Sequence, residues 1–180
     1  MTAENVAPPR PDVPTSLDEF MAYAIAMEYD AAARYEELAN IMEVHNNVPV
    51  ANLFRSMATI ERKHAVQLLA QMSWSEAPDI GVPPWGKAGA DAPETTPLDE
   101  VHYLMQPYHA LTLAHSCEQR AVEFFRVLAR STTNVAVRRA ALALAAEERE
   151  HVTLVEQWLA KVSMPSPDWD EDPDPPRYSD

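Results

Sequence analysis

The sequence has 180 residues, 47% of them apolar, and a formal net charge of −14 at pH 7. An acidic surface repels nucleic-acid phosphates and anionic lipids, so neither nucleic-acid binding nor membrane association is expected. The chain is long enough to bury one hydrophobic core, and no apolar run reaches the roughly 18 residues of a membrane span.

The single cysteine, Cys117, excludes an internal disulfide and any cysteine-based zinc or iron–sulfur site within one chain. The first 14 residues lack the basic and apolar regions of a signal peptide, so a cytoplasmic location is expected.

Prolines and glycines separate stretches that are rich in Ala, Leu, Met and Glu, which favours long helices between irregular connections. Residues 1–14 are expected to be a flexible, Pro-rich arm. The capping-box pattern from Ser16 to Glu19 predicts a helix that continues to about Val44. Asn47, with a proline two residues later, is expected to cap a second helix that ends near residue 73.

Residues 74–97 contain all three glycines and five of the 16 prolines, which predicts a long connection that crosses the bundle and joins two parallel helices. Pro107 is expected to break or kink the third helical region, leaving a short segment at 98–105 and a main helix at about 108–130. A fourth helix is predicted at about 134–161. Residues 163–180 form an acidic, Pro-rich tail, which is expected to be disordered or loosely packed.

Two helical hairpins joined by a crossover form a four-helix bundle, so residues 15–162 are predicted to be one all-α domain. The two hairpins also read as an internal repeat. In each, a glutamate is followed seven residues later by an aromatic residue, and a Glu-x-x-His pair comes after the turn. The repeated ionisable residues are Glu28, Glu61, His64, Glu118, Glu148 and His151.

These six residues lie at helical spacing among apolar neighbours, which points them at the core, where unpaired charge is costly. Within each hairpin the lone glutamate and the Glu/His pair stand at similar distances from the turn. With a rise of about 1.5 Å per residue, their heights differ by only about 3–5 Å. Four carboxylates balance two divalent cations, and oxygen-rich ligation with two imidazoles suits iron or manganese, with zinc as a substitute. The pattern therefore predicts a two-metal site.

Three further residues have open roles. Glu147 could accept a hydrogen bond from His64 and orient it, or be a solvated surface residue. Tyr35 could hydrogen-bond near the metals or simply pack in the core. His115 could be an extra ligand, although a core or rim histidine is the simpler interpretation.

The chain resembles the rubrerythrin and bacterioferritin branch of the ferritin-like di-iron superfamily over about residues 16–161. The resemblance rests on the segments that begin at Glu28 and Glu118 and on the two Glu-x-x-His pairs. It implies a ferritin-like four-helix bundle, whose third helix region is here expected to be kinked because of Pro107. It also implies terminal ligation by Glu28 and Glu118, bridging by Glu61 and Glu148, and one imidazole per iron from His64 and His151.

The chain departs from this family at places that matter for activity. Ala121 stands where rubrerythrins usually carry a further glutamate, and one cysteine cannot supply a rubredoxin module. Arg62 stands where bacterioferritins carry the haem-ligating methionine, so no haem is expected. An acidic tail replaces the short fifth helix of many cage ferritins, which favours a homodimer or small homo-oligomer over a closed cage.

The leading hypothesis is an oxidoreductase of the ferroxidase or rubrerythrin type, which binds two Fe ions and oxidises Fe(II) with O₂ or peroxide. The electron donor is not indicated. Two alternatives stay open: a non-catalytic metal-binding or cargo protein that docks a partner through its acidic tail, and a di-metal oxygenase acting on an organic substrate. A bundle with a purely structural or zinc-filled site is a further alternative.

Overall fold

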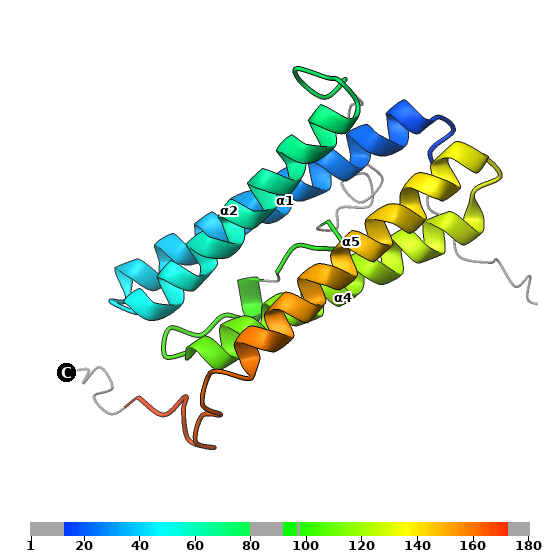
Figure 1. Cartoon of the computed structure of the whole chain (residues 1–180). Helices are drawn as coiled ribbons and strands as arrows, with labels where there is room; N and C mark the ends of the chain where they lie inside the picture. Colours follow the sequence, from blue (N-terminus) through cyan, green and yellow to red (C-terminus); the bar gives the residue numbers. More distant parts are fainter. Residues whose placement is uncertain (1–12, 80–91, 97, 173–180) are drawn as a thin grey trace, which may run out of the picture.

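The structure is a computed structural model that describes residues 13–79, 92–96 and 98–172. The described part is all-helical, with four long helices and one short 3-10 helix (Figure 1). None of the described helices combines the length and the apolar character needed to cross a membrane. The all-α fold class predicted from the sequence is confirmed, whereas the proposed N-terminal arm lies mostly outside the described residues.

Helix α1 spans Leu17–Val44 and begins where the capping pattern predicts. The Ser16 side chain accepts a hydrogen bond from the backbone N–H of Glu19 at 3.1 Å. The Glu19 carboxylate accepts the backbone N–H of Thr15 at 2.8 Å, so donors at the helix start are satisfied. The helix is followed by Asn46 at φ 58°, a left-handed conformation that asparagine adopts more readily than most residues.

Helix α2 spans Val48–Gln71, but Asn47 does not cap it through its side chain as expected. The Asn47 amide instead donates to the backbone carbonyls of Tyr103 and Met105, at 3.2 and 2.7 Å. A cap would need the amide oxygen as an acceptor, whereas the amide is held by its N–H groups on a distant part of the chain, which no local pattern reveals. The residue therefore ties the first hairpin to the segment that precedes α4.

The third helical region breaks rather than bends. A 3-10 helix, η1, covers only Leu98–Glu100, and helix α4 covers Pro107–Ser131 with Pro107 in its first turn. This is a position where proline is tolerated because its missing N–H would have no helical partner. Helix α5 spans Val135–Leu159, and the Asn134 side chain caps it by accepting from the N–H groups of Ala136 and Val137.

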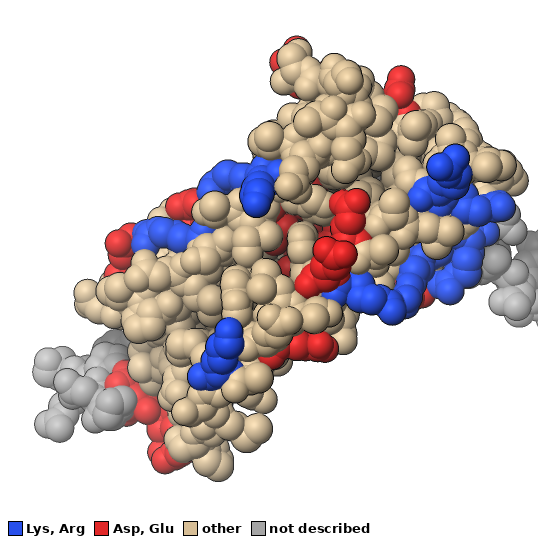
Figure 2. Space-filling model, viewed as in Figure 1, with Lys and Arg blue, Asp and Glu red and all other residues tan. Residues whose placement is uncertain are grey.

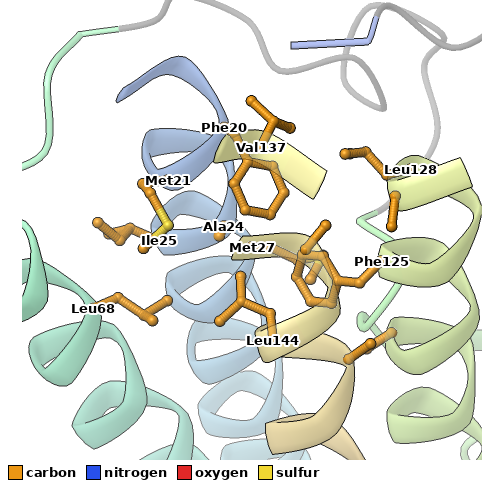
Figure 3. Close-up of a cluster of buried hydrophobic side chains, with 14 of the residues drawn as sticks. Phe20, Met21, Ala24, Ile25, Met27, Leu68, Phe125, Leu128, Val137 and Leu144 are labelled. Carbon is orange, nitrogen blue, oxygen red and sulfur yellow. The ribbon is translucent and has the colours of Figure 1, made fainter. Parts of the chain in front are cut away.

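Helices α1 and α2 pack along each other as one hairpin, and α4 and α5 pack as the other (Figure 1). The buried apolar side chains form two clusters. One surrounds Phe20, Leu68 and Phe125 (Figure 3), and the other surrounds Leu38 and Phe54. Both clusters draw on both hairpins, so together they hold the bundle closed around the layer between them.

The described part of the tail, residues 163–172, folds back onto the bundle. The Trp169 ring lies 3.8 Å from the His109 ring between centroids and 5.5 Å from that of His102. The Tyr103 hydroxyl donates to Asp172 at 2.6 Å. Aromatic contacts therefore attach this part of the tail, which agrees with the second of the two expectations, loose packing on the surface.

Replacing Phe125 with alanine should destabilise the fold by about 3–5 kcal/mol, because it removes a fully buried ring and leaves a cavity. The Phe125 ring packs edge-on against Phe20 at 6.0 Å between centroids, so this contact is lost as well. Urea unfolding of the metal-free protein measures the change. The exposed Leu142→Ala is the control and should stay within about 0.5 kcal/mol of wild type. Equal effects of the two substitutions would contradict the described core.

Candidate metal centre

All six residues of the repeated pattern meet in one layer between the two apolar clusters. Helix α1 supplies Glu28, α4 supplies Glu118, and α2 and α5 each supply a Glu/His pair. The four glutamates have no solvent exposure, and the side chains of His64 and His151 are 5% and 18% exposed. Their two rings lie 5.0 Å apart between centroids.

One group of potential ligand atoms comes from Glu28, His64 and Glu148, whose atoms all lie within 4.8 Å of one another. The Nδ1 of His64 is 2.9 Å from Glu28 Oε1 and 3.7 Å from Glu148 Oε1. The 2.9 Å contact lacks the geometry of a hydrogen bond, so this nitrogen and the carboxylate oxygens converge without being satisfied by one another.

A second group comes from Glu61, Glu94, Glu118 and His151, again with the ligand atoms within 4.8 Å of one another. The Nδ1 of His151 lies 3.5 Å from Glu118 Oε2 and 3.2 Å from Glu148 Oε2. Glu148 thus approaches both histidines, and Glu61 also falls in a third group with both of them. Two adjacent positions able to hold cations therefore share Glu61 and Glu148.

Glu94 is the residue that the sequence pattern missed. It lies in the crossover, between Pro93 and Thr95, and has no counterpart in the repeat of the two hairpins. Its side chain is nevertheless fully buried. Helical periodicity cannot detect a residue in an irregular loop, and the length of the connection was the one feature that hinted at a role for it.

Both carboxylate oxygens of all five glutamates have no hydrogen-bond partner among the described residues, and neither do the Nδ1 atoms of the two histidines. Buried polar atoms are normally satisfied, and buried carboxylates are very costly when they are not. Divalent cations bound between these oxygens and nitrogens would satisfy them all at once. The donor set therefore fits a pair of iron or manganese ions, with zinc also able to bind.

The electrostatics of the layer follow from burial and mutual contact. Burial raises the pKa of Glu28 to about 7, while the contact with His64 opposes the rise. Burial also raises the pKa values of Glu61 and Glu118, and neighbouring glutamates add to the rise. The opposite occurs at the imidazoles. Burial alone would lower their pKa values, but the surrounding carboxylates raise that of His64 to about 9 and that of His151 to about 11.

The three further residues with open roles, Glu147, Tyr35 and His115, lie at different places around the layer. The Nε2 of His64 lies 2.9 Å from Glu147 Oε2. Glu147 can therefore accept a hydrogen bond from Nε2–H, which in the neutral ring leaves the lone pair on Nδ1, the nitrogen that faces the other carboxylates. Tyr35 is buried and stacks on Phe54 at 6.0 Å between centroids, while its hydroxyl has no partner among the described residues. His115 instead contacts Glu156 at 3.2 Å on the rim.

A surface pocket between α2 and α5 opens onto both histidines. Gln67, Gln71, Glu147 and Glu150 line it together with His64, Ala70 and His151. Figure 2 shows acidic side chains gathered in the middle of this face. An opening lined by amides and carboxylates admits water and small cations, and its negative charge attracts the latter.

Comparison with known proteins identifies this arrangement. The family model described as Rubrerythrin matches residues 19–82, which contain the first hairpin. The chain is also similar to the crystal structure of an uncharacterized conserved protein from Magnetospirillum magnetotacticum MS-1. The two are 38% identical over 84% of this chain and 98% of that chain, with a TM-score of 0.60. The chain belongs to the rubrerythrin-like branch of the ferritin-like superfamily. No curated protein matches it.

The rubrerythrin match covers Glu28, Glu61 and His64, which are half of the predicted ligands. The other half, Glu118 and the α5 pair, lies outside the matched range but occupies the same layer. The rubrerythrin-like assignment therefore agrees with the geometry on both sides of the bundle.

The metal-free protein should lose stability as the pH rises from 5 to 9. The raised pKa of Glu28 means that the folded state holds its proton more tightly than the ordinary value of 4.5 implies, so its stabilisation is lost between about 4.5 and 7. The raised pKa of His64 gives stability below 6.5 that is lost towards 9. Thermal melting after chelation measures both.

The variant Glu28→Gln should flatten the lower part of this pH profile, whereas the surface variant Glu36→Gln should leave it unchanged. Added Co(II) should reverse the slope, because metals bind the deprotonated ligands. A melting temperature that is constant or rises with pH in the metal-free protein would contradict the described electrostatics.

Proposed function

We propose that the protein binds two iron ions in this layer and oxidises Fe(II) with O₂ or peroxide, as a di-iron oxidoreductase of the ferroxidase or rubrerythrin type. One observation carries the proposal: five buried glutamates, none with a hydrogen-bond donor to its carboxylate among the described residues, surround two imidazole nitrogens. Such a cluster is costly for folding and favourable for binding cations. It is therefore best explained by a bound metal pair.

The positions of the side chains suggest their roles. Glu28 and His64 would hold one metal, and Glu118 and His151 would hold the other. Glu148 approaches both histidines, and Glu61 groups with both, so these two carboxylates are placed to bridge. Glu147 holds His64 from the solvent side and fixes which nitrogen faces the metals.

Bound iron would supply the one-electron chemistry that amino-acid side chains lack. Two Fe(II) ions would supply one electron each, and O₂ would take these two electrons and two protons to form H₂O₂, or H₂O₂ would take them to form two water molecules. The protein's part would be to hold the two ions side by side through its carboxylates and imidazoles. The open pocket between α2 and α5 gives Fe(II) and the oxidant a polar route to His64 and His151.

The structure bears differently on the alternatives. An oxygenase acting on an organic substrate needs an apolar pocket beside the metals, whereas the pocket that opens onto the histidines is lined by amides and carboxylates. A cargo protein needs a tail that is free to dock, whereas the tail up to Asp172 is attached through Trp169 and Tyr103. The metal-binding protein without turnover is therefore the second candidate. Docking of a partner through the tail would then have to use residues beyond 172.

The deciding experiment is anaerobic loading with Fe(II), followed by separate additions of O₂ and of peroxide while absorbance is recorded. Wild type should bind iron and oxidise it faster than buffer does. The double variant Glu61→Ala/Glu148→Ala should lose most of its bound iron and oxidise Fe(II) no faster than buffer, because both shared carboxylates are gone. The double variant Glu36→Ala/Glu123→Ala, at surface carboxylates, should behave as wild type.

Two results would overturn this assignment in different ways. Bound iron with oxidation no faster than in buffer would support the metal-binding protein without turnover. A protein that contains no metal after expression in iron-rich medium, and that takes up none on loading, would rule out both functions.

A further inference from the structure

The crossover contributes a carboxylate to the metal centre. Glu94 has no exposed surface, and both its oxygens lack a hydrogen-bond partner among the described residues. One of its oxygens lies within 4.8 Å of ligand atoms from Glu61, Glu118 and His151, which also lie within that distance of one another. A residue in an irregular connection has no helical register to hold it there, so its placement needs a separate cause.

That cause is a set of hydrogen bonds to the backbone on either side of Glu94. Arg120 of α4 donates through Nε to the Pro93 carbonyl at 2.9 Å and through Nη2 to the Thr95 carbonyl at 3.0 Å. Arg34 of α1 donates through Nη1 to the Thr96 carbonyl at 3.0 Å. Two helices from different hairpins thus hold the peptide units that flank Glu94.

A side-chain contact completes this attachment. The Thr96 hydroxyl lies 3.1 Å from the sulfur of Cys117, which is buried next to Glu118 on α4. Arg120 also donates to the same sulfur at 3.2 Å. The segment 92–96 is therefore fixed at one level of α4, the level at which Glu118 enters the layer.

We propose that Glu94 is a seventh protein ligand, which binds the metal held by Glu61, Glu118 and His151. The inference rests on the proposed two-metal function and extends it, because it makes the two metal positions unequal. One position has Glu28, His64 and the shared carboxylates. The other has one more carboxylate, and the total of five exceeds the charge of two divalent cations by one.

A purely structural glutamate would be arranged differently. A carboxyl buried for packing normally has a hydrogen-bond partner, whether it is protonated or ionised. The Thr95 hydroxyl next to it is buried as well and does not bond to it. Among the described residues, Glu94 makes no hydrogen bond through its carboxylate and lies beside other candidate ligands of a metal, which is the arrangement expected of a ligand.

The test is titration of chelated protein with Co(II) under nitrogen, recording the visible absorption of the bound ion and the stoichiometry by equilibrium dialysis. Wild type should bind two ions. Glu94→Gln keeps the size of the side chain and removes its charge. It should bind the first ion as wild type does and the second at least about 10-fold more weakly, because even indirect partners of a ligand are worth about 10- to 100-fold.

The absorption of the second ion should change in the variant, since a charged carboxylate ligand is replaced by a neutral, weaker amide. The matched control is Glu100→Gln, an exposed residue of η1 in the same connection, which should reproduce wild type in both readouts. Wild-type affinity and spectrum in Glu94→Gln would overturn the proposal while leaving the two-metal function intact. Failure of wild type itself to bind two ions would remove both.

Thermal melting of the metal-free proteins decides the case in which the variant folds poorly. If Glu94 is a ligand, Glu94→Gln should melt at or above the wild-type temperature without metal and gain less from Co(II), because an unpaired buried carboxylate has been removed. A metal-free variant that melts well below wild type, or does not fold, would show that Glu94 is structural and would overturn the proposal.

Discussion

The structure depends on the burial of carboxylates in the middle of the bundle. Charged groups withdrawn from water without partners cost several kcal/mol each, so the layer opposes folding of the metal-free chain. The two apolar clusters on either side, around Phe20 and Phe125 and around Leu38 and Phe54, supply the compensating stability. Placing strongly unfavourable groups between two well-packed cores is how the fold tolerates a site suited to cations.

Much of the fold and most of this layer could be predicted because both follow from helical periodicity. Glutamates such as Glu28 and Glu118 stand out because the residues one helical turn before and after them include Ala or Val, and an aromatic residue follows two turns later. Their common level follows from counting residues to each turn. The bounds of α1, α2, α4 and α5 lie within about two residues of the predicted ones. Capping residues and prolines mark the ends of these helices, and their interiors contain no glycine.

The parts that could not be predicted depend on contacts between segments far apart in the chain. Asn47 has the local chemistry of a helix cap, yet its amide bonds carbonyls more than 50 residues away. Glu94 has no periodic neighbours, and its position is determined by Arg34 and Arg120 on two different helices. The local sequence does not predict such partners, because the same polar residues would be equally typical of the protein surface.

These non-local contacts give the centre two different sides. Residues 92–96 of the crossover, held by Arg34 and Arg120, lie against α1 and α4, on the side where Glu94 and the stacked ring of Tyr35 lie. The side formed by α2 and α5 keeps a polar pocket lined in part by His64 and His151, and acidic side chains gather in the middle of this face (Figure 2). A small cation that enters this pocket reaches the two imidazoles first. The Glu94 carboxylate lies away from this pocket and leaves that route open, so the proposed ligation by Glu94 would give the long connection a role beyond linking two hairpins.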